Sequence, residues 1–159
     1  MIQRVQHFAE AAERFCAWAE GGSSSHENEA AVALQHLSSL YQQALNLPTL
    51  SGDEDPGEVT HEEWANVHRR LGSLPFNYYW QCFNPSDLST EAPGVADLAD
   101  DLADIWRDLK RGLSLFHAGH IEAAGQEWRQ SFWQHWGHHA AGGLYALHSW
   151  LAERQRGAP

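Results

Sequence analysis

The fold is decided by one stretch of the sequence, VADLADDLADIWRDLKRGLSLF, which runs from Val95 to Phe116. Its apolar residues recur at steps of three and four, which is the period of one face of an α-helix. Pro93 can open this helix, because proline at the first helical position sacrifices no backbone hydrogen bond. The pattern therefore predicts one long amphipathic helix with a buried face. That face carries Val95, Leu98, Leu102, Ile105, Leu109, Leu113 and Phe116.

The amino-terminal part of the chain predicts a pair of helices joined by a short polar turn. Apolar residues recur at helical steps over residues 2–19, and the sequence GGSSS at 21–25 ends this helix. Ser24 and Glu27 have the spacing of a capping box, which is typical of a helix start. The second helix then stops at Pro48. These signals favour a helical hairpin.

Two further helices are expected, one on each side of the opening stretch. Thr60 and Glu63 form another capping box, and the short helix that follows ends near Gly72. After the opening stretch, HAGH at 117–120 turns the chain into a final long helix, with a bend expected at the glycine pair 142–143. The stripe of this last helix carries Ile121, Trp128, Phe132, His135, His139 and Trp150.

The segment LPFNYYWQCFNP, Leu74 to Pro85, holds five aromatic residues between two prolines. We expect a short helix packed on the core, since aromatic residues bury large areas. Stacking on nucleotide bases is the alternative, but basic residues are missing nearby. The acidic segment from Pro48 to Val59 is expected to be a solvated loop. Because no strands alternate with these helices, the sequence predicts an all-α fold, a compact bundle of five to six helices with a long C-terminal antiparallel helix hairpin, as a single domain over 1–159.

The formal net charge of −11 restricts the possible partners. A field of that sign repels phosphate groups, which argues against nucleic acid and anionic membranes. The sequence contains no apolar run long enough for a signal peptide or a bilayer span, so we expect a cytoplasmic protein. Cys16 and Cys82 are far apart in the sequence, and we interpret them as two buried thiols rather than as zinc ligands.

Three segments of the sequence carry a family resemblance: LPFNYYWQCFNPSD, DDLADIWRDLKRGLSLFHAG and WRQSFWQHWGHHA. Together they resemble an uncharacterised bacterial family, domain of unknown function 5063 (DUF5063). The likeness spans most of the chain and is weakest in the loop around Gly52 to Glu58. The resemblance implies an all-helical fold and no established activity.

Polar residues follow the apolar faces of the two longest predicted helices. With about 100° per residue, His135 and His139 fall on the apolar side of the last helix, whereas His138 falls toward its edge. On the opening helix, aspartates at steps of four, three and four form a stripe along one flank. They are Asp97, Asp101, Asp104 and Asp108.

An antiparallel arrangement of these two helices brings acidic and basic residues level with one another. If the turn centres on Ala118 and Gly119, residues whose numbers sum to about 237 lie level, since each helix rises about 1.5 Å per residue. The expected level pairs are Asp101 with His135, Asp97 with His139, and Asp108 with Arg129.

The resulting candidate cluster permits several interpretations. Its members are Asp97, Asp101, Asp104, His135 and His139. The first interpretation is structural, because a buried imidazole needs a partner for its ring N–H and an aspartate supplies one. The second is a divalent metal site formed by Asp101, His135 and His139, as helical bundles build carboxylate and histidine sites.

A third alternative is an all-helical nucleotide pyrophosphohydrolase, whose Mg²⁺ sites use acidic residues at helical spacing. The leading expectation is an interaction or regulatory module without catalysis and without a cofactor, which binds a protein partner or forms a homo-oligomer. A metal-dependent hydrolase that uses the Asp/His cluster is the alternative, and it would bring a divalent metal.

Overall fold

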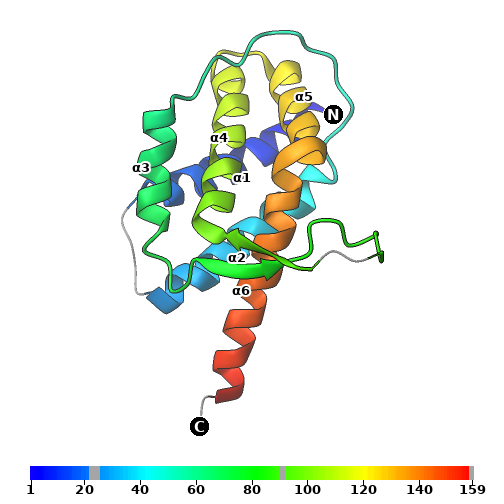
Figure 1. The fold of residues 1–159 in the computed structure, drawn as a ribbon. Coiled ribbons are helices and arrows are strands. Elements are labelled where there is room, and N and C mark those ends of the chain that lie inside the picture. Colours follow the sequence, from blue (N-terminus) through cyan, green and yellow to red (C-terminus); the bar gives the residue numbers. More distant parts are fainter. Residues whose placement is uncertain (22–25, 90–91, 158–159) are drawn as a thin grey trace.

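The computed structural model describes residues 1–21, 26–89 and 92–157, which form a predominantly helical structure (Figure 1). The helices are α1 (Ile2–Glu20), α2 (His26–Ala44), α3 (His61–Leu71), α4 (Leu98–His117), α5 (Ile121–Ser131) and α6 (Gly137–Gly157). A π-helical segment, η1 (Phe132–Trp136), joins α5 to α6 without a break. One small sheet pairs β1 (Tyr78–Gln81) with β2 (Gly94–Asp97). The predicted helical class is confirmed.

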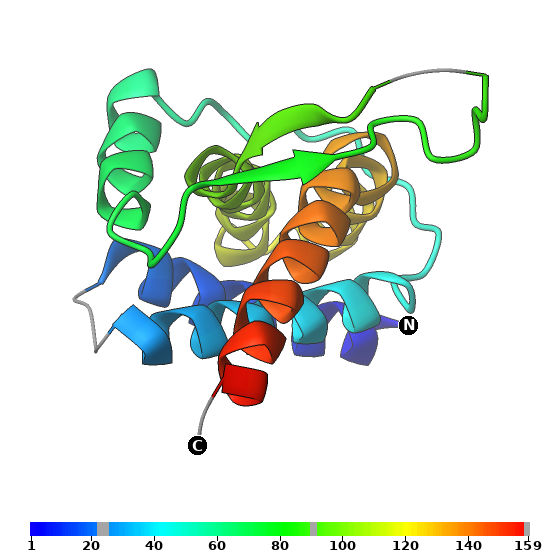
Figure 2. The same cartoon turned by 60° about the horizontal axis from the view of Figure 1, so that its bottom comes forward.

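Helix α4 lies at the centre of the bundle, which is the place that its buried face requires. In Figure 1 it runs between α3 and α5, and Figure 2 shows α1 and α2 on one side of it and the two strands on the other. The core predicted from the sequence is confirmed. Its members, each at most 2% exposed, are Leu98, Leu102, Ile105, Leu109, Trp128 and Phe132.

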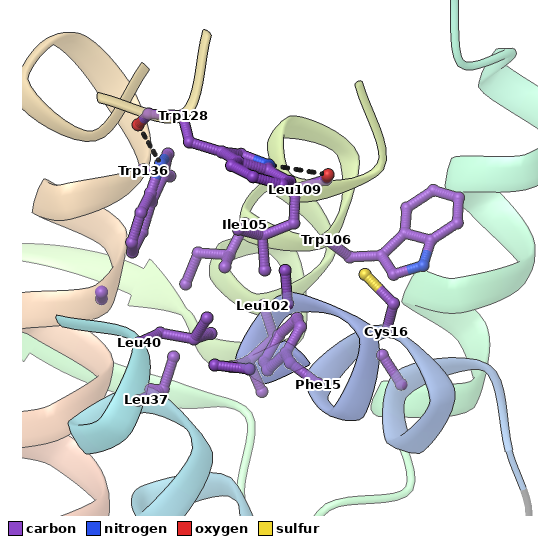
Figure 3. Close-up of a cluster of buried hydrophobic side chains, with 14 of the residues drawn as sticks. Phe15, Cys16, Leu37, Leu40, Leu102, Ile105, Trp106, Leu109, Trp128 and Trp136 are labelled. Carbon is purple, nitrogen blue, oxygen red and sulfur yellow. Dashed lines mark hydrogen bonds between the residues drawn. The ribbon is translucent and has the colours of Figure 1, made fainter. Parts of the chain in front are cut away.

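Two tryptophans join the last helix to this core (Figure 3). The indole Nε1 of Trp128 donates to the carbonyl of Leu109 at 3.1 Å, and that of Trp136 donates to the carbonyl of Trp128 at 3.4 Å. Both side chains are fully buried, so these bonds satisfy polar groups that are out of reach of water. Phe15 of α1 and Leu40 of α2 close the cluster from the opposite side.

The predicted ends of α3 and the predicted turn after α4 occur where expected. Gly119, with φ of +89°, makes the turn between α4 and α5, a conformation that glycine adopts without strain. Thr60 and Glu63 form a complete capping box at the start of α3, which ends before Gly72. Ser24, the other predicted cap, lies outside the described residues.

The prediction of a helix within Leu74 to Pro85 is wrong, because this segment contributes β1. The strand pairs with β2 in antiparallel register, from Tyr78 opposite Asp97 to Gln81 opposite Gly94. Its side chains alternate between exposed and half-buried, as a strand with one face on a helix bundle requires. Aromatic residues also fit a pleated surface better than a helix.

The strands also change where the opening helix begins. Residues 94–97 belong to β2, so α4 starts at Leu98 rather than after Pro93. The side chain of Asp97 accepts hydrogen bonds from the backbone N–H groups of Ala99 and Asp100, which makes it the N-cap. Val95 is consequently exposed on the sheet instead of lying on the helix face.

The irregularity in the last helix occurs earlier than predicted, at η1 rather than at residues 142–143. A π-helical turn holds an extra residue and displaces the side chains that follow it. Gly142 serves a different purpose, since a Cβ there would lie 2.5 Å from the hydroxyl of Tyr79. The glycine therefore lets α6 approach β1 closely.

The two cysteines differ in exposure. Cys16 is buried as expected, but Cys82 is exposed, so its predicted burial is wrong: it follows directly after β1, outside the core. Burial raises the pKa of the Cys16 thiol.

Over the described residues, no helix combines the length and the apolar character that a bilayer span needs.

The contact between α4 and Trp128 predicts the effect of one small substitution. A Cβ at Gly112 would enter the Trp128 indole, which the hydrogen bond to Leu109 holds in place. We expect Gly112→Ala to lower the free energy of unfolding by about 1–3 kcal/mol, as overpacking does. Urea unfolding followed by circular dichroism measures this.

The matched control is Gly157→Ala at the end of α6, where an added Cβ meets nothing within 4 Å. We expect this variant to stay within about 0.5 kcal/mol of the parent. Equal stability of the two variants would show that Trp128 does not pack against α4 as described.

Candidate metal centre

The candidate site lies between α4 and the helix that runs from α5 through η1 into α6. Helix α4 carries Asp101, Asp104 and Asp108 at steps of three and four, so the three carboxylates share one side. His135 belongs to η1, and His139 lies in the first turn of α6, one turn further along. The two helices therefore present carboxylates and imidazoles to each other.

Each imidazole binds one carboxylate through its Nδ1 atom. His135 Nδ1 lies 2.7 Å from Asp108 Oδ2, and His139 Nδ1 lies 2.7 Å from Asp101 Oδ1. An ionised carboxylate has only acceptor oxygens, so both Nδ1 atoms carry the proton and donate it. When a ring is neutral, its Nε2 atom then carries a lone pair and no proton.

The two Nε2 atoms point toward each other and toward a third acceptor. They lie 3.3 Å apart. Asp104 Oδ2 lies 3.7 Å from the Nε2 of His139 and 3.9 Å from that of His135. In the part of the chain that the structure describes, these are the three side chains grouped closely enough to hold one metal ion. Three possible ligand atoms thus lie within 4.8 Å of one another.

The carboxylate of Asp104 is held in position by two partners of its Oδ1 atom, the oxygen other than the one that faces the imidazoles. Its Oδ1 atom accepts a hydrogen bond from Trp64 Nε1 at 2.9 Å and pairs with an Arg107 guanidinium nitrogen at 2.8 Å. Trp64 comes from α3 and stacks against His68 with ring centroids 5.0 Å apart. Oδ1 is therefore occupied, and Oδ2 faces the imidazoles.

Three acceptors that face one another repel unless a cation lies between them. A proton is one such cation, and the hydrogen bond to Asp101 raises the pKa of His139 against the opposing effect of its burial. A metal ion is the other, and it binds neutral imidazoles and ionised carboxylates. Asp104 and His139 are largely buried, whereas the His135 side chain is 41% exposed. The site is thus open on the His135 side.

Asp101 has a different position from the one expected of a metal ligand. Its Oδ1 atom binds His139, and its Oδ2 atom accepts a hydrogen bond from the hydroxyl of Tyr79 in β1. Both oxygens are engaged, so Asp104 rather than Asp101 completes the ligand set with the two histidines. Burial together with Asp101 raises the pKa of the Tyr79 hydroxyl, which stays protonated and donates.

The three level pairs expected from the sequence are wrong. His135 pairs with Asp108 instead of Asp101, and His139 pairs with Asp101 instead of Asp97. The expected pairs assume regular α-helical spacing throughout, and the π-helical segment η1 changes that spacing in the second helix. Arg129 donates to the carbonyl of Leu47 at 3.0 Å instead of binding an aspartate.

Asp97 does not join the site, because it caps α4 and lies 4.0 Å from His68. His138 is exposed, as the helical phase predicts. Two residues that contribute to the site were not recognised from the sequence. Trp64 lies in the short helix that the sequence predicts between Thr60 and Gly72, and Tyr79 lies in the segment that is expected to be helical. The sequence YYWQ shows no alternation of polar and apolar residues that could have indicated which side chains face the bundle.

Comparison with known proteins gives a family and a related fold. The model of the DUF5063 family, described as a domain of unknown function, matches residues 2–153. A crystal structure of protein BF1032 from Bacteroides fragilis is 27% identical, with a TM-score of 0.76 over 91% of this chain and 90% of that chain. No curated protein matches the chain.

The Asp108–His135 pair generates a prediction about stability in the absence of metal. Asp108 is buried, and its removal leaves the Nδ1–H of His135 without its partner. We expect Asp108→Ala to lose about 1–3 kcal/mol of unfolding free energy, measured by urea unfolding in the presence of EDTA. The exposed loop variant Asp53→Ala serves as control and should change by less than about 0.5 kcal/mol. Similar values for both variants would mean that the pair contributes nothing to the fold.

Proposed function

The chain belongs to the DUF5063 family, and because that family has no assigned activity, we propose a function from the side chains themselves: the protein binds one divalent metal ion. The ligands are Asp104, His135 and His139. One observation carries the proposal. Each Nδ1–H is directed at a carboxylate, so the Nε2 atoms of two neutral rings and Asp104 Oδ2 are three acceptors that face one another, an arrangement that a cation stabilises.

The distances favour a tetrahedral ion of the zinc type. With Zn–N bonds of about 2.0–2.1 Å, two ligands of a tetrahedron lie about 3.3–3.4 Å apart. The two Nε2 atoms are 3.3 Å apart, which fits this value. Asp104 Oδ2 is further away, at 3.7 and 3.9 Å, and a small rotation of its carboxylate brings it onto the ion. Imidazole and carboxylate are both common ligands of zinc.

The surroundings of the ligands support the same proposal. In metal sites, a ligating histidine usually donates its other ring N–H to a carboxylate, and a ligating carboxylate is itself hydrogen-bonded. Asp101 and Asp108 perform the first task, and Trp64 performs the second. Such partners fix ring orientation before the ion arrives, which reduces the entropy that binding costs.

Three protein ligands leave one position of a tetrahedral ion for another molecule. Structural zinc sites are usually closed by four protein ligands, whereas catalytic sites keep one position for water or substrate. This observation favours the metal-dependent hydrolase as a second candidate function. In that role, the bound ion would lower the pKa of a water molecule at the open position and make it a nucleophile.

In the other candidate role, an interaction or regulatory module without catalysis, the same ion binds a partner instead of a reactive water molecule. A side chain of a protein partner, or of a second copy of the chain, then completes the coordination from the exposed His135 side. Exposed apolar residues on and around the sheet are compatible with a partner in this role. They include Tyr78, Trp80, Phe83, Leu88 and Val95. A protein partner and a cytoplasmic location stay predictions from the sequence.

Metal binding is tested directly on purified protein. We expect about one zinc ion per chain by elemental analysis, and a fall in melting temperature when EDTA removes it, because an ion that binds the folded state stabilises it. His139→Ala and Asp104→Ala should each abolish stoichiometric binding. His138→Ala is the matched control, since His138 is the exposed neighbour of His139, and it should retain the ion.

Two results contradict the proposal. The first is a parent protein that binds no zinc, manganese or iron after metal-replete expression. The second is a loss of zinc in His138→Ala that equals the loss in His139→Ala, which would place the ion elsewhere on this helix.

The hydrolase role is tested with an activated ester such as p-nitrophenyl acetate. If the open position holds a reactive water molecule, the zinc-loaded protein should hydrolyse the ester faster than EDTA-treated protein. The increase should be absent in His139→Ala and present in His138→Ala. Equal rates with and without zinc would leave the interaction role as the remaining proposal for the ion.

A further inference from the structure

The β-hairpin formed by β1 and β2 reaches the proposed metal site through a single side chain, Tyr79. The Tyr79 hydroxyl donates to Asp101 Oδ2, and Asp101 Oδ1 accepts from His139 Nδ1. A continuous path of two hydrogen bonds therefore leads from the strand to a proposed ligand. In the same strand, Tyr78 points away from the helices and is 69% exposed.

The position of Tyr79 depends on a close approach between β1 and α6. A Cβ at Gly142 would lie 2.5 Å from the Tyr79 hydroxyl and 2.9 Å from the side-chain nitrogen of Gln81. An added Cβ there would require these side-chain ends to shift. The hairpin is also tied to α4, because the backbone N–H of Leu98 donates to the carbonyl of Asn77 at 2.6 Å.

We infer that Tyr79 is a positioning residue for the metal ion, and that the place of the hairpin on α6 regulates how tightly the ion is held. This inference rests on the proposed metal binding and adds its regulation. With the hairpin in place, Asp101 is fixed by two donors and holds the His139 ring with its Nε2 toward the ion. With the hairpin displaced, Asp101 loses one donor and can rotate, which releases the ring from that orientation.

The coupling must act in both directions. If displacement of the hairpin weakens ion binding, then ion binding must oppose displacement of the hairpin by the same free energy. Zinc should therefore hold the hairpin more firmly on the bundle. The backbone hydrogen bonds between β1 and β2 provide the readout, since amide hydrogen exchange slows when local opening becomes less frequent.

Tyr79→Phe removes the hydroxyl and keeps the ring, and Tyr78→Phe is the matched control on the exposed face of the same strand. Zinc affinity is measured by competition with a chromophoric chelator. Loss of a direct partner of a metal ligand costs about 10–100-fold in affinity, and Tyr79 acts one step further out, so we expect Tyr79→Phe to weaken zinc binding by up to about 10-fold and Tyr78→Phe to stay within about twofold. Zinc should slow exchange in the hairpin of the parent but much less in Tyr79→Phe.

Gly142→Ala provides a second test that leaves the Tyr79 hydroxyl intact but requires it to shift. It should also weaken zinc binding. A purely structural role for Tyr79 would lower stability in EDTA while leaving zinc affinity unchanged.

The outcomes separate the two proposals. If the parent binds zinc, and Tyr79→Phe and Gly142→Ala bind it as tightly as Tyr78→Phe, the regulatory inference fails and metal binding stands. If the parent binds no zinc, both fail together.

Discussion

The pairing of two aspartates on α4 with two histidines on the following helix determines the chemistry of this protein. The Nδ1–H of His135 donates a hydrogen bond to Asp108, and the Nδ1–H of His139 donates one to Asp101. These bonds fix both rings, and they leave two lone pairs facing Asp104. Pairs of this kind also satisfy buried polar groups, so the same contacts serve stability and the proposed metal site. Asp104 differs from the other two aspartates, because it belongs to neither Asp–His pair and its Oδ2 atom faces both imidazoles.

The π-helical segment η1 makes this arrangement possible. It lies between Trp128, which is bound to the backbone of α4, and His139, which binds Asp101. The pairs expected from regular α-helical spacing match His135 and His139 with different aspartates. The extra residue of a π turn costs regular hydrogen bonds, and such turns occur frequently at functional sites. In this protein the turn contains one of the proposed ligands, His135.

The core was predictable from the sequence because helical periodicity reports burial directly. Leu98, Leu102 and Trp128 follow that period, and all three are fully buried. The histidines and aspartates were likewise recognised as a cluster, since their helical phase is local information. Which aspartate meets which histidine was not predictable, because that depends on η1. Tyr79 was missed for a different reason: the four residues of its strand show no alternation of polar and apolar residues that could have indicated which side chains face the bundle.

The most direct test of the account is the X-ray absorption spectrum of the zinc-loaded protein, because it reports the ligand atoms themselves. We predict two imidazole nitrogens at about 2.0–2.1 Å, with oxygen as the only other type of donor. His139→Ala should remove the imidazole signal at equal zinc concentration. A zinc–sulfur distance of about 2.3 Å, which would indicate the exposed Cys82, would contradict the account, as would a shell of oxygens without imidazole.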